Sequence, residues 1–201
     1  MFNDVEFKLA AAKAGTPNAI TAKGQTIDFP AGHFNRVYVL AASADGDQNA
    51  AFDIGGKHAD LNIQDWSGFI GQWDDRQWNG TKLDVDHANY GQMTGLKQGY
   101  IKRANLAWYC DHHHDADGKN VTYAYSYLFG YAIDLPAGAK TVKLPQNDKI
   151  RILAISVADE NPAVRPAQPL YDVLPPPNAP PGTITYSGSI PDTTLAATKG
   201  N

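Results

Sequence analysis

The sequence predicts an all-β protein: an antiparallel β-sandwich of the jelly-roll type, followed by an extended C-terminal linker. Short runs of β-branched and aromatic residues recur along the chain. The 18 glycines and 13 prolines supply the turns between these runs. Helical patterning is weak and is confined to residues 8–13, because Gly15 and Pro17 end it.

The strands follow one another with short turns between them. Residues 34–43 form the clearest strand, and the Asp45-Gly46 pair favours a hairpin turn into the strand after it. The sequence between 65 and 99 is aromatic and rich in glycine, and its pattern is irregular. The expected strands are 34–43, 50–54, 61–63, 101–109, 121–133, 141–144 and 150–157.

The sandwich is expected to span residues 1–174. Pro162 marks the end of the regular pattern, and residues 175–182 are rich in proline, which favours an extended and semi-stiff chain. Residues 183–201 are rich in serine, threonine and glycine and offer little to bury. We therefore predict a linker or tail over residues 175–201.

Composition excludes some partners. The net charge of −4 provides no basic footprint for nucleic acid. No apolar run approaches the roughly 20 residues of a membrane-spanning helix, so we expect no membrane partner. The first residues lack the charged and apolar regions of a secretion signal. This leaves either a cytosolic protein or a part of a longer secreted chain, and we expect a secreted or periplasmic location as part of a larger chain.

A family resemblance rests on five stretches of the chain. Together they resemble a β-rich domain in the C-terminal portion of some bacterial glycoside hydrolase family 38 α-mannosidases, over nearly all of residues 6–174. The resemblance implies an accessory domain beside a catalytic glycosidase domain, and it carries over no catalytic residue. Residues 132–136 also look like the galactose-binding-like sandwiches that accompany many glycosidases. The five stretches are 24–27, 30–42, 65–78, 125–129 and 165–172.

Residues 72–78 combine the side chains that a sugar site needs. Trp73 and Trp78 can stack on the C–H faces of a sugar, while Asp74 and Arg76 can bond its hydroxyl groups. Trp66 precedes them and is a further candidate. The alternative is that the tryptophans fill the core of the sandwich, since large aromatic side chains are usually buried.

A second polar cluster lies between two expected strands, at residues 111–120. His112 and His114 would share one face of an extended chain, and could bond a sugar or ligate a transition metal. Asp115, Asp117 and Asn120 resemble part of a short calcium loop but lack its distant bidentate glutamate. A polar hairpin tip without ligand is the third interpretation.

Aromatic residues alternate along the strand that follows. Tyr123, Tyr125 and Tyr127 have a period of two, which places them on one sheet face. They either pack into the core or form a flat platform for sugar, and Tyr123 is a candidate ligand. The single cysteine, Cys110, cannot form an internal disulfide and is expected to act as a small buried apolar residue.

These observations predict a non-catalytic carbohydrate-binding module that targets an attached glycosidase to its polysaccharide or oligosaccharide. We expect no cofactor, with structural calcium as the alternative. A structural role beside a catalytic domain is the first rival function. A small hydrolase or jelly-roll metalloenzyme is the second, but adjacent carboxylates such as Asp74 and Asp75 point apart on a strand and suit glycoside hydrolysis badly.

Overall fold

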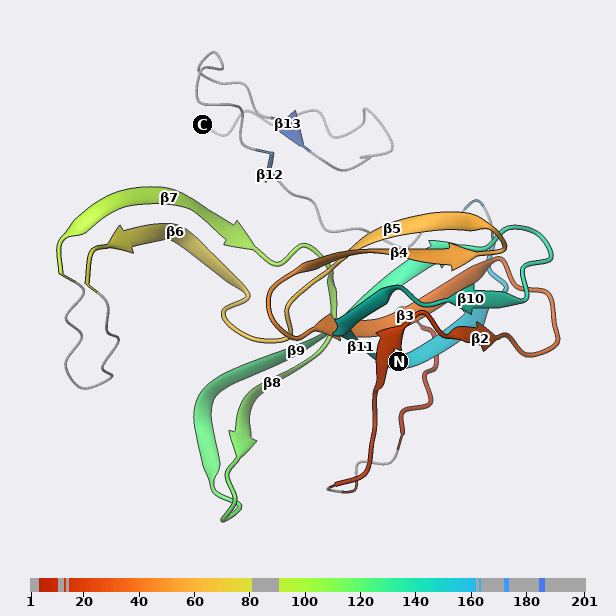
Figure 1. Cartoon of the computed structure of the whole chain (residues 1–201), viewed down its shortest axis with the longest axis horizontal. Coiled ribbons are helices and arrows are strands. Elements are labelled where there is room, and N and C mark those ends of the chain that lie inside the picture. Colours follow the sequence, from red (N-terminus) through yellow and green to blue (C-terminus); the bar gives the residue numbers. More distant parts are fainter. Residues whose placement is uncertain are drawn as a thin grey trace, which may run out of the picture.

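The protein is described here from a computed structural model, shown in Figure 1. It describes residues 4–10, 13, 15–80, 91–161, 163, 172–173 and 185–186. For residues 73–75, 78, 97–98, 100, 172–173 and 185–186 it describes the backbone but not the side chains. The described part of the chain is all-β, and no helix in it is long and apolar enough to cross a membrane.

Two sheets form the body of the molecule, and all their strand pairs are antiparallel. One sheet has the order β1-β11-β3-β9-β8 and the other the order β2-β10-β4-β5. This confirms the predicted β-sandwich. The first sheet contains β1 (Ile20–Lys23), β11 (Gln146–Ala158), β3 (Arg36–Ser43), β9 (Asn120–Asp134) and β8 (Asn105–His114); the second contains β2 (Thr26–Asp28), β10 (Thr141–Lys143), β4 (Gln48–Ile54) and β5 (Lys57–Ile63).

The core lies between these sheets. Strand β3 is central in its sheet, and all eight of its residues are buried, which explains its continuous apolar sequence. Strand β4 alternates instead, because it buries one face only. The largest fully buried apolar side chains come from both sheets and include Tyr38, Phe52, Ile54, Ile63, Phe129, Ile150 and Ile152.

An ion network around the buried Arg36 closes one end of the first sheet. The Arg36 guanidinium lies 3.3 Å from the Asp134 carboxylate and also pairs with Glu160. The Tyr38 hydroxyl donates to Glu160 at 2.7 Å. Burial raises the pKa of Tyr38, and its hydrogen bond to the Glu160 carboxylate raises it further. The network therefore joins β3, the end of β9 and the segment after β11.

Two hairpin arms leave the sandwich on the same side (Figure 1). Strands β6 (Gly71–Trp78) and β7 (Met93–Ile101) pair with each other and with neither sheet. The second arm is the outer part of the β8–β9 hairpin, residues 107–128, which lies beyond the last pair between β9 and β3 and continues past the edge of the sandwich.

The expectation of irregular structure between residues 65 and 99 was wrong where the β6–β7 arm forms. Its strands are held by backbone pairing along the hairpin, and neither contributes a residue to the described core. A strand alternates apolar and polar residues when one of its faces is buried in the core. The strands of this arm bury no face in the described core, so their sequence need not alternate. In the C-terminal region, β12 (Asp172–Val173) pairs with β13 (Thr185–Tyr186), and most of the predicted tail lies outside the described residues.

Candidate functional site

The β6–β7 arm joins the sandwich at a junction held by Asp65. One carboxylate oxygen of Asp65 accepts from the Gly46 amide at 2.7 Å and the Asp45 amide at 3.2 Å. The other accepts from the Ser67 amide at 2.8 Å and the Ser67 hydroxyl at 2.7 Å. Partial burial raises the pKa of Asp65, but these hydrogen bonds together outweigh it and hold the pKa below its usual value. The carboxylate thus fixes the chain at the start of the arm.

Gln64 and Lys102 connect the outgoing and returning chains of the same arm. The Gln64 side chain is buried, accepts from the Arg103 amide at 2.6 Å and donates to Asp47 at 3.1 Å. The Lys102 ammonium donates to the Asp65 carbonyl at 2.8 Å. Burial lowers the pKa of Lys102, opposed by the charges of Asp65 and Asp47. These bonds make the base of the arm a rigid structure.

Aromatic side chains gather on this base. Trp66 and Phe69 are 48% and 57% exposed. The Phe69 and Tyr125 rings lie 6.3 Å apart between centroids, and the Tyr127 amide donates to the Trp66 carbonyl at 2.7 Å. We call Trp66, Phe69 and Tyr125 the junction aromatics. Trp66 does not fill the core, since about half of its side chain is exposed; its assignment to a sugar site stays a prediction.

Exposed apolar residues of the described chain concentrate on the arms and at this junction. Apart from Leu9 and Ile20, all the large exposed ones lie between Trp66 and Tyr123. Monomeric proteins rarely expose large contiguous apolar patches without a binding role. The set consists of Trp66, Phe69, Ile70, Met93, Leu96, Ile101, Leu106, Trp108, Tyr109, Val121 and Tyr123.

The segment predicted to hold the main sugar site forms strand β6. Arg76 is exposed there and pairs in register with Leu96 of β7. The side chains of Trp73, Asp74 and Trp78 lie outside the described residues, so their assignment to a sugar site stays a prediction. The backbone places these residues on an arm outside the described core.

The histidine cluster lies on the β8–β9 arm. Residues 111–114 belong to β8 and not to a turn, and the turn itself covers residues 115–119. The His112 and His114 rings meet edge to face with centroids 5.4 Å apart. This confirms that these two side chains share one face.

Strand pairing breaks within this arm. Cys110 pairs with Ser126 and His112 pairs with Thr122, so Asp111 alone faces residues 123–125 of β9. Tyr123 takes a φ of +61° and its side chain is 82% exposed, whereas Tyr127 is buried. The three tyrosines therefore do not form a uniformly buried or a uniformly exposed stripe, and the assignment of Tyr123 to a sugar site stays a prediction.

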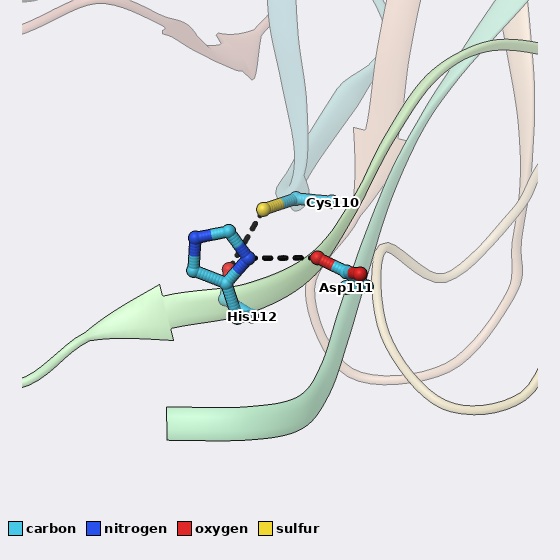
Figure 2. A group of neighbouring side chains, drawn as sticks. All are labelled: Cys110, Asp111 and His112. Carbon is cyan, nitrogen blue, oxygen red and sulfur yellow. Dashed lines mark hydrogen bonds and ion pairs between the residues drawn. The ribbon is translucent and has the colours of Figure 1, made fainter. Parts of the chain in front are cut away.

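Cys110, Asp111 and His112 converge at this break (Figure 2). The His112 Nδ1 lies 2.7 Å from an Asp111 carboxylate oxygen, and the Cys110 thiol donates to the His112 carbonyl at 2.7 Å. The hydrogen bond from His112 lowers the pKa of Asp111. Cys110 is half-buried rather than buried as expected, because β8 is the edge strand of its sheet. Cys110 was not predicted to belong to a site, because a lone cysteine in a strand gives no sequence signal for one.

The proposed calcium ligands lie at the tip of the arm. One carboxylate oxygen of Asp115 accepts from the Asp117 and Lys119 amides, both at 2.9 Å. This arrangement is that of a turn stabilised by its own aspartate. The assignment of Asp115, Asp117 and Asn120 to calcium stays a prediction.

Comparison with known proteins identifies the domain family. The family model of the AziU2-like beta-sandwich domain matches residues 1–161, which include both sheets up to the end of β11 and both arms. No curated protein matches this chain. The match agrees with the predicted β-sandwich, while the resemblance to an α-mannosidase domain stays a prediction. The chain belongs to the AziU2-like β-sandwich domain family.

Proposed function

We propose that this domain binds carbohydrate, without hydrolysing it, through the junction aromatics and the exposed aromatic residues of the β8–β9 arm. The observation that carries the proposal is the number of exposed aromatic rings in these two regions. Trp66 and Phe69 are exposed at the junction, and Trp108 and Tyr109 are exposed on the β8–β9 arm. Sugars present C–H faces that pack on such rings. Aromatic rings also lose little conformational entropy when they bind, because they have only two side-chain torsions.

The rigidity of the junction supports the same proposal. The backbone of residues 64–67 is held by the hydrogen bonds of Gln64, Asp65 and Lys102. A site already ordered before binding pays less for immobilising its side chains. The junction aromatics are therefore suited to weak but specific stacking on an oligosaccharide.

The absence of hydrolysis is part of this proposal. Most glycosidases need a carboxyl group that stays protonated near neutral pH, opposite a second carboxylate. At the junction, the pKa of Asp65 is lowered, and each of its two carboxylate oxygens accepts two hydrogen bonds. Asp65 is thus suited to structure and not to proton donation.

As a non-catalytic module the domain would act by proximity. Within a larger secreted or periplasmic chain it would hold an attached glycosidase at its polysaccharide and raise the local substrate concentration. The expected partners are thus a polysaccharide or oligosaccharide and a catalytic domain of the same chain.

A second function, docking onto a neighbouring protein domain, is favoured by the aliphatic residues of the β6–β7 arm. Met93, Leu96 and Ile101 are each more than half exposed on β7. Aliphatic side chains offer no ring for stacking and suit a protein surface better than a sugar.

Isothermal titration calorimetry with mannan, xylan, galactan and glucan oligosaccharides at millimolar concentration tests the binding. A stacked ring contributes about 1 kcal/mol, by analogy with aromatic pairs, so Trp66→Ala and Phe69→Ala should each weaken binding several-fold. Leu9→Ala is the matched control, because Leu9 and Phe69 are both 57% exposed but Leu9 lies outside the arms.

The outcomes separate the candidate functions. Binding that is lost in both ring variants and kept in Leu9→Ala would support the sugar site. No binding to any of the four glycans would favour the docking function instead. Release of reducing ends by the unaltered protein would contradict the absence of hydrolysis.

A further inference from the structure

The side chains of Cys110, Asp111 and His112 form a cluster that the proposed sugar site does not use. One donor atom from each lies within 4.8 Å of the other two. Figure 2 shows one nitrogen of the His112 ring facing the Asp111 carboxylate, with the Cys110 sulfur close to the same side of the ring. Among the histidine, cysteine, aspartate and glutamate residues that the structure describes, these three have ligand atoms close enough together to share a metal ion.

The break in strand pairing explains why three consecutive residues can converge. On a regular strand Cys110 and His112 point to one face and Asp111 points to the other. Here Asp111 alone faces residues 123–125 of β9, and bulges of this kind turn a side chain away from its regular direction. The left-handed backbone of Tyr123, at φ +61°, lies within the same break. A bulky residue rarely adopts this conformation outside constrained sites.

The donor set selects the class of ligand. A thiolate and an imidazole are the donors that zinc and its neighbouring transition metals prefer, whereas calcium requires oxygen. From this chemistry and the convergence of the three side chains, we propose that Cys110, Asp111 and His112 bind a transition-metal ion, with Zn²⁺ the expected one. The fourth position would be taken by water or by His114, whose ring already touches that of His112.

The geometry requires only small side-chain movements. With Zn–S near 2.3 Å and Zn–N near 2.0 Å, the ligand atoms of a tetrahedral ion lie roughly 3.3–3.6 Å apart. The His112 Nδ1 and the Asp111 oxygen are already 2.7 Å apart. The Asp111 and His112 side chains are 70% and 35% exposed, so an ion can reach them and they have room to separate around it.

Binding also defines a proton balance. The Cys110 thiol gives its proton to solvent and binds as thiolate, while Asp111 binds as carboxylate. His112 binds through Nδ1 as a neutral imidazole with its proton on Nε2. The hydrogen bond between His112 and Asp111 is replaced by bonds from both residues to the ion. Metal affinity should therefore rise with pH.

The same contacts argue against a cysteine nucleophile. The His112 Nδ1 faces Asp111, and the Cys110 thiol bonds to a backbone carbonyl instead of the ring nitrogen. An activated cysteine needs its thiol within hydrogen-bond reach of the base. The cluster therefore has the composition of a metal site and lacks the arrangement of a catalytic pair.

Titration with Co²⁺ tests the proposal directly. The protein, free of any polyhistidine tag and kept reduced, is titrated with cobalt chloride while the absorption of thiolate-to-cobalt charge transfer is recorded. We expect a band that saturates at one ion per chain and disappears when one equivalent of Zn²⁺ is added. Cys110→Ser should abolish the band, and His112→Ala should weaken cobalt binding by at least 10-fold.

His113→Ala is the matched control, because His113 is exposed on the same strand but points away from the cluster. Far-ultraviolet circular dichroism verifies that each variant is folded. Retention of binding by His113→Ala supports the site. The proposal is overturned if the unaltered protein gives no charge-transfer band, if Cys110→Ser keeps it, or if His113→Ala loses as much affinity as His112→Ala. Sugar binding does not enter this readout, so the two proposals can fail separately.

Discussion

At the scale of single residues, Asp65 determines the structure of the junction. Its carboxylate accepts four hydrogen bonds from Asp45, Gly46 and Ser67, and its own amide donates to Asp47 at 2.8 Å. A turn between two strands of the sandwich is thereby tied to the first residues of the arm. The backbone next to the exposed Trp66 ring is thus held by a carboxylate whose two oxygens are both used within the junction.

Asp65 should make stability depend on acid pH. Its folded-state pKa lies below the ordinary value of 3.8, so the unfolded chain binds more protons between the two pKa values. This stabilisation is complete above the ordinary pKa and is lost as pH falls through the folded-state pKa. Urea unfolding between pH 2 and pH 7 should show this loss in the unaltered protein.

The variant Asp65→Asn should be less stable at neutral pH by about 1–3 kcal/mol, since amide donors lose an acceptor. The free energy of unfolding of this variant should also change less with pH below 3.8 than that of the unaltered protein. Asp60→Asn is the control, because Asp60 is exposed on β5, and it should keep the slope of the unaltered protein. Equal slopes for Asp65→Asn and the unaltered protein would contradict the role of Asp65.

At the scale of elements, the sequence predicts those strands that bury a face. Strand β3 is apolar throughout because both faces are buried, and β9 was predicted within one residue at each end. The β6–β7 arm was missed because it contributes nothing to the described core. The convergence of Cys110 with Asp111 and His112 could not be predicted either. It depends on the break in pairing at which one residue of β8 faces three residues of β9, and a single strand's sequence does not show where pairing breaks.

The β4–β5 hairpin depends on two glycines with positive φ. Gly55 and Gly56 have φ of +59° and +81°, as a two-residue turn of type I′ requires. A side chain at Gly56 would meet nothing within 4 Å, so its cost is conformational. Gly56→Ala should lower the free energy of unfolding by about 1–2 kcal/mol.

Gly95→Ala is the control for that measurement. Gly95 lies on β7 without a positive φ, and an added methyl group would meet Gln77 at an ordinary 3.9 Å. Urea denaturation should give this variant nearly the stability of the unaltered protein. If both alanine variants lose stability equally, the left-handed turn does not account for the effect.

At the scale of the whole molecule, the core and the exposed rings lie in different parts of the described chain. The described core residues come from the two sheets and from segments that adjoin them, and none lies within residues 71–101. The exposed rings lie on the arms and at their junction. Composition and resemblance could only nominate aromatic residues as candidate ligands, whereas the structure shows which of the described rings are exposed.

The sandwich should fold without the β6–β7 arm. The Lys102 amide donates to the Ile70 carbonyl at 2.8 Å, so an Asn-Gly turn replacing residues 71–101 would close the chain between them. Because no described core residue is removed, we expect a cooperative thermal transition within roughly 2–4 °C of the unaltered protein, equivalent to about 1 kcal/mol. Phe52→Ala, which opens the core between the sheets, should instead cost about 3–5 kcal/mol. Loss of the cooperative transition in the shortened chain would mean that the arm stabilises the sandwich. If the transition and sugar binding are both preserved, the binding surface lies on the junction and the β8–β9 arm.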